Sequence, residues 1–203
     1  IKYVMLSRHY ASDVDILDSD YQIAETHLYY FYKTLEKMQK FIEEYNGDAT
    51  KEMFESEFSK EIVTKFIEVM DEDFNTSAAV ANLHNIFKYA NAIMNEAKKS
   101  TRQVTANTLA KMLKDIRKVY SVLGLLEQNP EKFIIELKEK YLKKLQISPK
   151  DIETFIEERA NAKKNKDYNK ADFIRTELDS KGIILNDTVK GTKWDIKALY
   201  KVF

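Results

Sequence analysis

The clearest candidate for a functional surface lies in the last 45 residues, where basic, aromatic and acidic side chains are interleaved. These side chains are Arg159, Lys163, Lys164, Lys166, Tyr168, Lys170, Asp172, Arg175, Asp187, Lys190, Lys193 and Trp194. Such residue types recognise single-stranded RNA, because lysines neutralise phosphate, an aromatic ring stacks on an unpaired base, and a carboxylate or guanidinium reads base edges. The pattern therefore indicates RNA binding. The alternative is a solvated charge pattern around a Trp194 half-buried in its own hairpin.

Residues able to carry out covalent chemistry are scarce. The chain has no Cys and only three His, at His9, His27 and His84, which fall in different segments of the sequence. It contains no HExxH, GxSxG, GxGxxG or GxxxxGK pattern. The acidic run at 71–73 lacks the alternating oxygen ligands, the central Gly and the distant Glu of a calcium loop. We therefore expect no catalytic residue, no metal site and no cofactor within this chain.

Charge is balanced overall but divided along the chain. The 203 residues contain 33 Lys plus Arg and 33 Asp plus Glu. Residues 1–70 carry 8 basic and 14 acidic side chains, a net charge of −6, and residues 71–203 carry 25 and 19, a net charge of +6. This asymmetry favours an anionic partner for the C-terminal part, although solvated helix faces would also produce it.

Apolar side chains spaced three or four residues apart predict a mainly α fold. The predicted helices of the first part cover 20–45, 58–70, 77–98, 105–123 and 130–145. Gly47 and Gly124 are expected to supply left-handed C-terminal caps, and Asn75 or Thr76 an N-cap. His84 lies beside an apolar helix face, which predicts a packed, hydrogen-bonded side chain.

The character of the chain changes at Ser148-Pro149, an N-cap followed by Pro at the first helical position. The elements predicted after it are helices at 149–164 and 167–180 and short strands at 183–185 and 192–196. We therefore predict an antiparallel helical bundle at 1–147 and a small mixed α/β unit, a helical hairpin closed by a β-hairpin, at 148–203. A core of about 55 residues is marginal, so this unit is expected to lean on its neighbour.

Several long segments form an ordered set of motifs. They are YVMLSRHY at 3–10, MDEDFNT at 70–76, RANAKKNKDYNKADFIR at 159–175, ELDSKGIILND at 177–187 and GTKW at 191–194. Together they resemble cysteinyl-tRNA synthetases. In that family the first segment follows the KMSKS loop, the second enters a bundle helix of the DALR domain, and the others form the C-terminal signature.

The resemblance implies the C-terminal part of a class I aminoacyl-tRNA synthetase, which attaches cysteine to tRNA(Cys) using ATP. The catalytic domain, and the Cys and His ligands of its zinc, would lie upstream, so ATP and Zn²⁺ are implied for the parent protein and this chain alone would be inactive. An apolar run beginning at Ile1 also suggests a piece of a longer protein. The implied partners are tRNA(Cys) and the parent's own catalytic domain, in the cytoplasm and without a membrane.

The same resemblance assigns roles to individual residues. The position of Lys163 is usually an arginine that reads the first anticodon base, and that of Tyr168 an aromatic ring that stacks in the anticodon loop. Asp172 and Asp187 stand where acids face anticodon bases. Lysine cannot make arginine's bidentate contact to guanine, so Arg159 or a neighbouring lysine is expected to share the role of Lys163. The predicted RNA-binding set is Arg159, Lys163, Tyr168, Asp172, Asp187 and Trp194.

Two other points stay open at this level. Trp194 either supports the fold or lines the RNA surface. The aromatic run at 29–32 predicts core packing with hydroxyls that reach the surface, but if Tyr29, Tyr30 and Tyr32 are exposed they could form the docking face of a helical protein-interaction scaffold. A cysteine ligase for a small molecule is a third possibility, against which the anticodon-like tail at 148–203 argues.

Overall fold

A computed structural model describes residues 1–11, 15–189 and 191–200 and confirms the mainly α fold class. The helices are accompanied, within the described residues, by a single two-stranded antiparallel sheet. The chain divides into two compact units, residues 1–133 and residues 134–203. The predicted domain boundary after residue 147 stays a prediction. In the described part of the chain, no helix is both long and apolar enough to cross a membrane.

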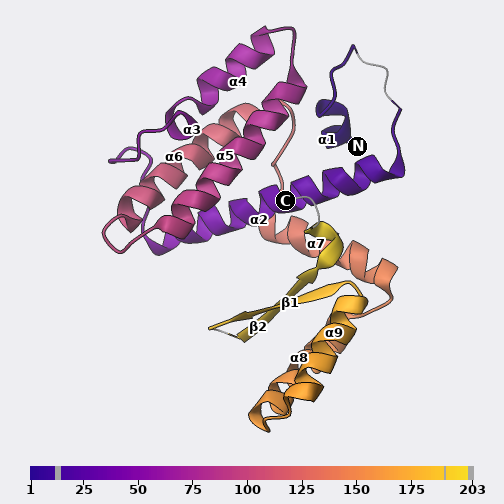
Figure 1. Cartoon of the computed structure of the whole chain (residues 1–203). Helices are drawn as coiled ribbons and strands as arrows, with labels where there is room; N and C mark the ends of the chain where they lie inside the picture. Colours follow the sequence, from indigo (N-terminus) through magenta and orange to yellow (C-terminus); the bar gives the residue numbers. More distant parts are fainter. Residues whose placement is uncertain (12–14, 190, 201–203) are drawn as a thin grey trace. The chain divides into compact units, whose positions relative to one another are not determined.

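The first unit is built from α-helices (Figure 1), of which the first along the chain was not predicted. They are α1 (Lys2–Leu6), α2 (Asp18–Glu44), α3 (Glu57–Lys60), α4 (Ile62–Asp71), α5 (Thr76–Glu96), α6 (Arg102–Tyr120) and the start of α7 (Pro130–Leu145). The single helix predicted at 58–70 is wrong in one respect, since the chain breaks at Glu61 into α3 and α4. Ser59 explains the tight first turn, because its buried hydroxyl donates to the carbonyls of Phe54 and Ser56.

The core of this unit lies between α2, α4, α5 and α6, which pack against one another. The rings of Phe31 on α2 and Phe87 on α5 stack with centroids 5.0 Å apart. Tyr120 at the end of α6 is buried, and its hydroxyl donates to the carbonyl of Ala79, 2.9 Å away. As predicted, the side chain of Asn75 caps α5, where it accepts from the N–H of Ala78. Burial of large apolar side chains with their polar ends satisfied is what stabilises the bundle.

Gly47 does not supply the predicted left-handed cap. Asn46 takes the left-handed conformation instead, with φ of 48°. Gly47 is required for a different reason, because a Cβ there would lie 2.4 Å from the carbonyl oxygen of Ala106 on α6. The glycine therefore permits a close approach of two backbones rather than a turn.

The tyrosines of the run at 29–32 do not form an exposed docking face. Tyr29 and Tyr32 are only 2% and 4% exposed. The ring of Tyr32 stacks on Phe133 with centroids 3.9 Å apart, and the hydroxyl of Tyr30 accepts from the side chain of Asn91. The expectation of core packing is confirmed. The alternative of a protein-interaction scaffold required these tyrosines to form an exposed surface, and they do not.

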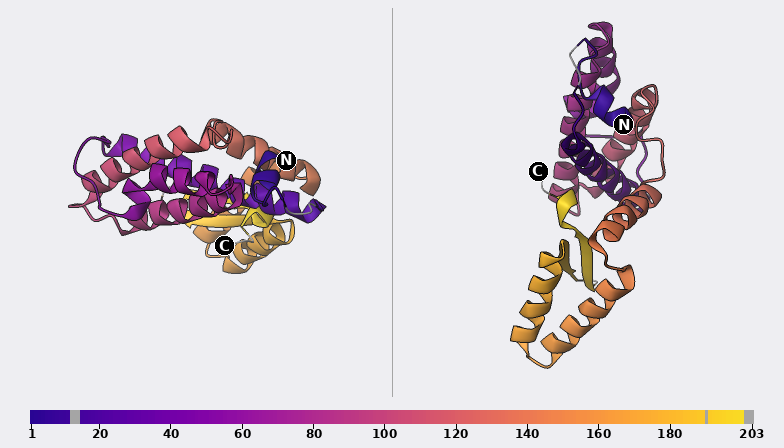
Figure 2. Two further views of the ribbon diagram at one scale, coloured as in Figure 1. Left: turned by 90° about the horizontal axis from the view of Figure 1, so that it is seen from above. Right: turned by 90° about the vertical axis from the view of Figure 1, so that its right-hand side faces the viewer.

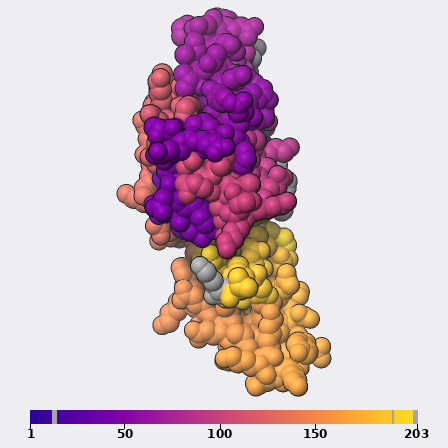
Figure 3. Space-filling model, turned by 90° about the vertical axis from the view of Figure 1, so that its left-hand side faces the viewer, coloured from indigo at the N-terminus to yellow at the C-terminus, as the bar shows by residue number. Residues whose placement is uncertain are grey.

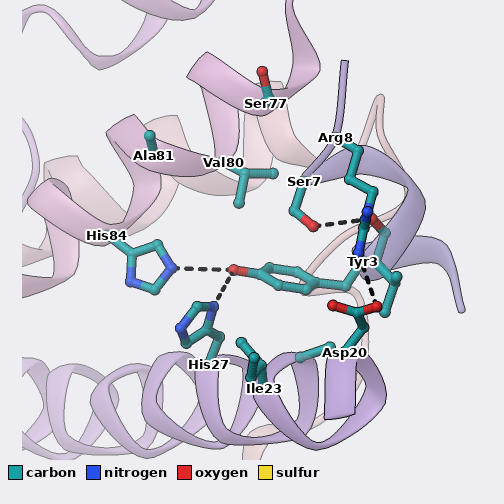
Figure 4. A pocket seen from close by; sticks show the side chains of 12 residues that line it. Tyr3, Ser7, Arg8, Asp20, Ile23, His27, Ser77, Val80, Ala81 and His84 are labelled. Carbon is teal, nitrogen blue, oxygen red and sulfur yellow. Dashed lines mark hydrogen bonds and ion pairs between the residues drawn. The ribbon is translucent and has the colours of Figure 1, made fainter. Parts of the chain in front are cut away.

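The helix α1 is anchored by a hydrogen-bonded cluster of Tyr3, His27 and His84 (Figure 4). The hydroxyl of Tyr3 lies 3.0 Å from Nδ1 of His27 on α2 and 3.0 Å from Nε2 of His84 on α5. A hydroxyl has one hydrogen, so it donates to one imidazole and accepts from the other. The cluster lies at the edge of a pocket of about 230 Å³ whose rim includes the ion pair between Arg8 and Asp20. The prediction of a packed, hydrogen-bonded His84 is confirmed.

Both imidazoles of this cluster are held neutral. Burial lowers the pKa of His84 to about 4, with a further contribution from repulsion by His27. Burial likewise lowers the pKa of His27. Each ring therefore takes up a proton more readily in the unfolded chain than in the folded one.

The second unit contains the rest of α7, followed by α8 (Pro149–Lys164), α9 (Tyr168–Ser180), β1 (Ile183–Thr188), β2 (Gly191–Ile196) and a short 3₁₀ helix at Lys197–Leu199. Ser148 is the predicted N-cap of α8 and also forms a capping box, in which its hydroxyl accepts from the N–H of Asp151. The helices α8 and α9 lie side by side as a hairpin (Figure 2), and α9 packs against β1. The core of the unit is apolar, formed by side chains such as Ile152, Ile174, Leu178, Ile183 and Ile196.

We expect the first unit to lose stability as the pH falls from about 6.5 towards 4. Over this window an unfolded histidine, with a pKa near 6.5, is protonated while His84 in the fold stays neutral, so the unfolded state binds more protons and is stabilised relative to the fold. Thermal unfolding at pH 7 and pH 5 should show a lower Tm at pH 5. In a His84→Asn variant this difference in Tm should shrink; an unchanged difference would contradict the assignment to His84.

Candidate nucleic-acid interface

The site is built around Arg159, which continues the apolar face of α8. Arg159 follows Ile152 by seven residues, two helical turns, so both side chains point into the interior of the second unit. Arg159 is only 4% exposed, although it carries a charge. A buried guanidinium requires a partner. That partner is supplied by the hairpin.

Asp187 meets Arg159 because of the two-residue period of strand β1. Side chains of Ile183, Leu185 and Asp187 point to the same face of the sheet, and the first two are buried. The face that carries apolar residues near the start of β1 therefore ends in a carboxylate. Across the ladder Asp187 pairs with Thr192 of β2.

The carboxylate of Asp187 receives four hydrogen bonds. Arg159 is bidentate, with Nη1 2.8 Å from Oδ1 and Nη2 3.0 Å from Oδ2. The Nζ of Lys163 donates to Oδ2 at 3.0 Å, and the hydroxyl of Thr192 donates to Oδ1 at 2.7 Å. Two cations and one hydroxyl thus converge on a single acid, and they come from α8 and β2.

These contacts favour the charged forms of both central groups. Hydrogen bonds from Arg159, then from Thr192 and Lys163, hold the pKa of Asp187 well below its usual range. The hydrogen bond to Asp187 raises the pKa of Arg159, with a smaller contribution from the charge of Asp172 on α9. Asp187 and Arg159 are therefore both ionised at neutral pH.

Arg159 also contains the one buried side-chain polar atom without a hydrogen bond among the described residues, its Nε. An unsatisfied buried donor costs about 1–3 kcal/mol, and such atoms are uncommon in folded proteins. The cost indicates that the guanidinium is not placed for stability alone.

The remaining predicted residues on α9 lie at its exposed start. Tyr168 is its first residue and is 62% exposed, and Asp172 lies one turn further on, also exposed. The atoms of α8 and α9 (orange) lie at the surface in Figure 3. Basic side chains without an ion pair in the described ranges are present on these helices and the loop between them, namely Lys164, Lys166, Lys170 and Arg175. Unpaired cations beside an exposed ring are the features that single-stranded RNA requires.

Trp194 has a different environment from the other five. It is half-buried, and the Nζ of Lys138 on α7 lies 4.4 Å from the centre of the indole ring. The same Nζ donates to the carbonyl of Trp194 at 2.9 Å and lies 3.2 Å from Oδ1 of the buried Asp195. One face of the indole is thus covered by a lysine, which favours the fold-supporting alternative for Trp194.

Most residues of the site could be identified from the sequence, but two residues, Thr192 and Lys138, were missed. The structure places Arg159, Lys163 and Asp187 in direct contact, while Tyr168 and Asp172 lie on α9, where the charge of Asp172 acts on Arg159. Thr192 was missed because the predicted first strand ended at residue 185, whereas β1 extends to Thr188 and pairs Asp187 with Thr192. Lys138 was also missed, and its distance of 56 residues from Trp194 leaves no local signal. Roles of these residues in RNA binding stay predictions.

We expect Lys138→Met to destabilise the second unit by about 1–3 kcal/mol, because the buried Asp195 loses its cation while the apolar stem is retained. Trp194 is the single tryptophan, so its fluorescence reports this environment directly. Urea unfolding followed by that fluorescence should show a lower midpoint and a changed folded-state emission. Lys143→Met, at an exposed position of the same helix, is the control; equal effects of the two variants would contradict this role of Lys138.

Comparison with known proteins agrees with the motifs. Residues 65–127 match the family model of the DALR domain. A cysteine–tRNA ligase from Geotalea uraniireducens is 32% identical over 209 residues, which cover 97% of this chain and 42% of the relative. One from Geobacter metallireducens is 35% identical over 202 residues, with 97% and 41% covered, and one from Acinetobacter baumannii is 34% identical over 194 residues, with 96% and 37% covered.

The chain spans about two fifths of the length of these curated relatives. The similarity nevertheless extends along almost all of this chain, through both structural units. The resemblance that the sequence motifs indicate is therefore confirmed: the chain is similar to part of a cysteine–tRNA ligase and contains a match to the DALR domain.

Proposed function

We propose that this chain is the tRNA-binding part of a cysteine–tRNA ligase and that its second unit recognises the anticodon of tRNA(Cys). The observation that carries the proposal is the cluster of Arg159, Lys163 and Asp187, together with an exposed Tyr168 at the start of α9, within segments that resemble the C-terminal signature of such ligases. The parent protein would attach cysteine to tRNA(Cys) using ATP and a zinc-containing catalytic domain in the cytoplasm. The role of this chain would be recognition, and it would carry out no chemistry itself.

Each part of the cluster has a defined role in this proposal. The ring of Tyr168 stacks on an unpaired anticodon base, and stacking of this kind contributes about 1–3 kcal/mol per base. The unpaired lysines of the α8–α9 hairpin neutralise phosphates of the loop. Lys163, Asp172 and Asp187 supply the donors and acceptors that select base edges. The helical bundle links this site to the catalytic domain.

Titration with tRNA, followed by Trp194 fluorescence, tests the proposal directly. The wild-type chain should bind a cysteine-type tRNA more tightly than the same tRNA with its first anticodon base changed. Its affinity should also fall about tenfold or more between about 50 and 200 mM salt, since phosphate contacts release counterions. Equal affinity for both tRNAs would limit the chain to phosphate contacts. Binding to neither tRNA would contradict the proposal and leave a protein partner as the alternative.

A matched pair of aromatic substitutions tests the stacking role. Tyr168 and Phe173 are 62% and 68% exposed on the same helix, but only Tyr168 occupies the motif's aromatic position. Tyr168→Ala should weaken tRNA binding about 10- to 100-fold because one stacked base loses its platform. Phe173→Ala should leave affinity within about twofold. Similar losses in both variants would indicate a general effect on α9 rather than stacking on Tyr168.

A further inference from the structure

The acceptor capacity of Asp187 is completely used within the protein. An ionised carboxylate offers about four lone-pair positions, two on each oxygen. Oδ1 accepts from Arg159 and Thr192, and Oδ2 accepts from Arg159 and Lys163. A base donor can therefore reach this carboxylate only if one of the three side chains releases it.

The three donors differ in how easily they can leave. Arg159 is 4% exposed, and its two bonds are parallel and bidentate, so withdrawing it would leave a buried charge unpaired. Thr192 is held opposite Asp187 by the strand register. The side chain of Lys163 is 44% exposed and makes a single bond to the carboxylate, and water can solvate its ammonium at once. Lys163 is the exchangeable donor.

Burial also excludes direct base reading by Arg159 in this arrangement. Its two Nη atoms are both committed to Asp187, and its Nε is enclosed in the interior of the unit. The guanidinium therefore exposes no N–H donor to a nucleotide. Its effect on RNA must pass through Asp187.

We propose that Arg159 is a positioning residue of the RNA site: it fixes the Asp187 carboxylate so that a base donor can take only the acceptor place that Lys163 fills in the free protein. The inference rests on the proposed function, because it assumes that this unit binds the anticodon. Bound RNA displaces the ammonium of Lys163 from Oδ2, and the released charge becomes available to the RNA. The two contacts from Arg159 persist, and they keep the Asp187 carboxylate ionised and in a fixed orientation.

Arg159→Lys is the decisive variant, because it keeps the charge and removes the bidentate hold on Asp187. The dissociation constant should be measured for a cysteine-type tRNA transcript and for transcripts with each anticodon base substituted singly. We expect discrimination at one of the three positions to fall at least about tenfold, since a single hydrogen bond to a charged acceptor contributes about that factor or more. The salt dependence should not change, because Arg159 does not touch phosphate.

Arg117→Lys is the matched control, because Arg117 is an exposed arginine on α6, outside the second unit, with no ion pair in the described part of the chain. This control should leave discrimination within about twofold. A purely structural role for Arg159 would weaken binding to all transcripts by the same factor and leave discrimination unchanged, and that result would overturn the inference. Failure of the proposed function would give a different result, because the wild-type chain itself would then show no discrimination among the transcripts.

A measurement on the unaltered chain covers the case in which Arg159→Lys does not fold. With ¹⁵N in the arginine and lysine side chains, NMR spectra recorded during titration with the cysteine-type transcript report each nitrogen separately. The signals of Arg159 should persist unshifted, while the ammonium signal of Lys163 changes as it leaves Asp187. The inference would be overturned if the Arg159 signals shift when RNA binds, or if the Lys163 signal does not change.

Discussion

The bidentate ion pair between Arg159 and Asp187 is the constraint on which the geometry of the second unit depends. It joins α8 to the β-hairpin at the point where the apolar face of β1 ends. An apolar pair of similar volume would join these elements as well or better, because burying a charge carries a large desolvation cost. Here the cost falls mainly on the guanidinium, whereas the carboxylate stays 47% exposed. An arrangement of this kind presents one ionised edge to solvent in a set orientation, which a stabilising apolar contact could not do.

The same principle, that each buried polar group is satisfied by a partner from another element, also organises the first unit. Asn107 on α6 is buried, and its side chain accepts from the N–H of Asp48 and donates to the carbonyl of Glu52. The hydroxyl of Tyr3 does the equivalent for two imidazoles on α2 and α5. Long loops and the short α1 are thus attached to the bundle by side-chain hydrogen bonds, which are worth little in exposed positions but are costly to break when buried.

Helix positions could be predicted from the sequence because local rules decide them. Ser148-Pro149 starts α8 where capping chemistry places it, and Arg159 is buried because it continues the period set by Ile152. Long-range contacts were not accessible in the same way. The role of Gly47 depends on the backbone of Ala106, and the environment of Trp194 depends on Lys138, both of which are distant in sequence. The motif resemblance named most of the site, but only the strand register shows how Thr192 and Arg159 share one carboxylate.

Lysine at position 163 has a physical consequence in this setting. Arg159 already occupies both oxygens of Asp187 with a planar fork, and Thr192 takes a further position on Oδ1. A second guanidinium at position 163 would find no pair of free lone pairs on this carboxylate, and a bidentate approach from that side would be blocked. A lysine needs only one acceptor, and its compact ammonium is strongly hydrated when released. Lys163, which stands where the resemblance implies an arginine, is therefore suited to a single, solvent-accessible contact of the kind that the proposed exchange requires.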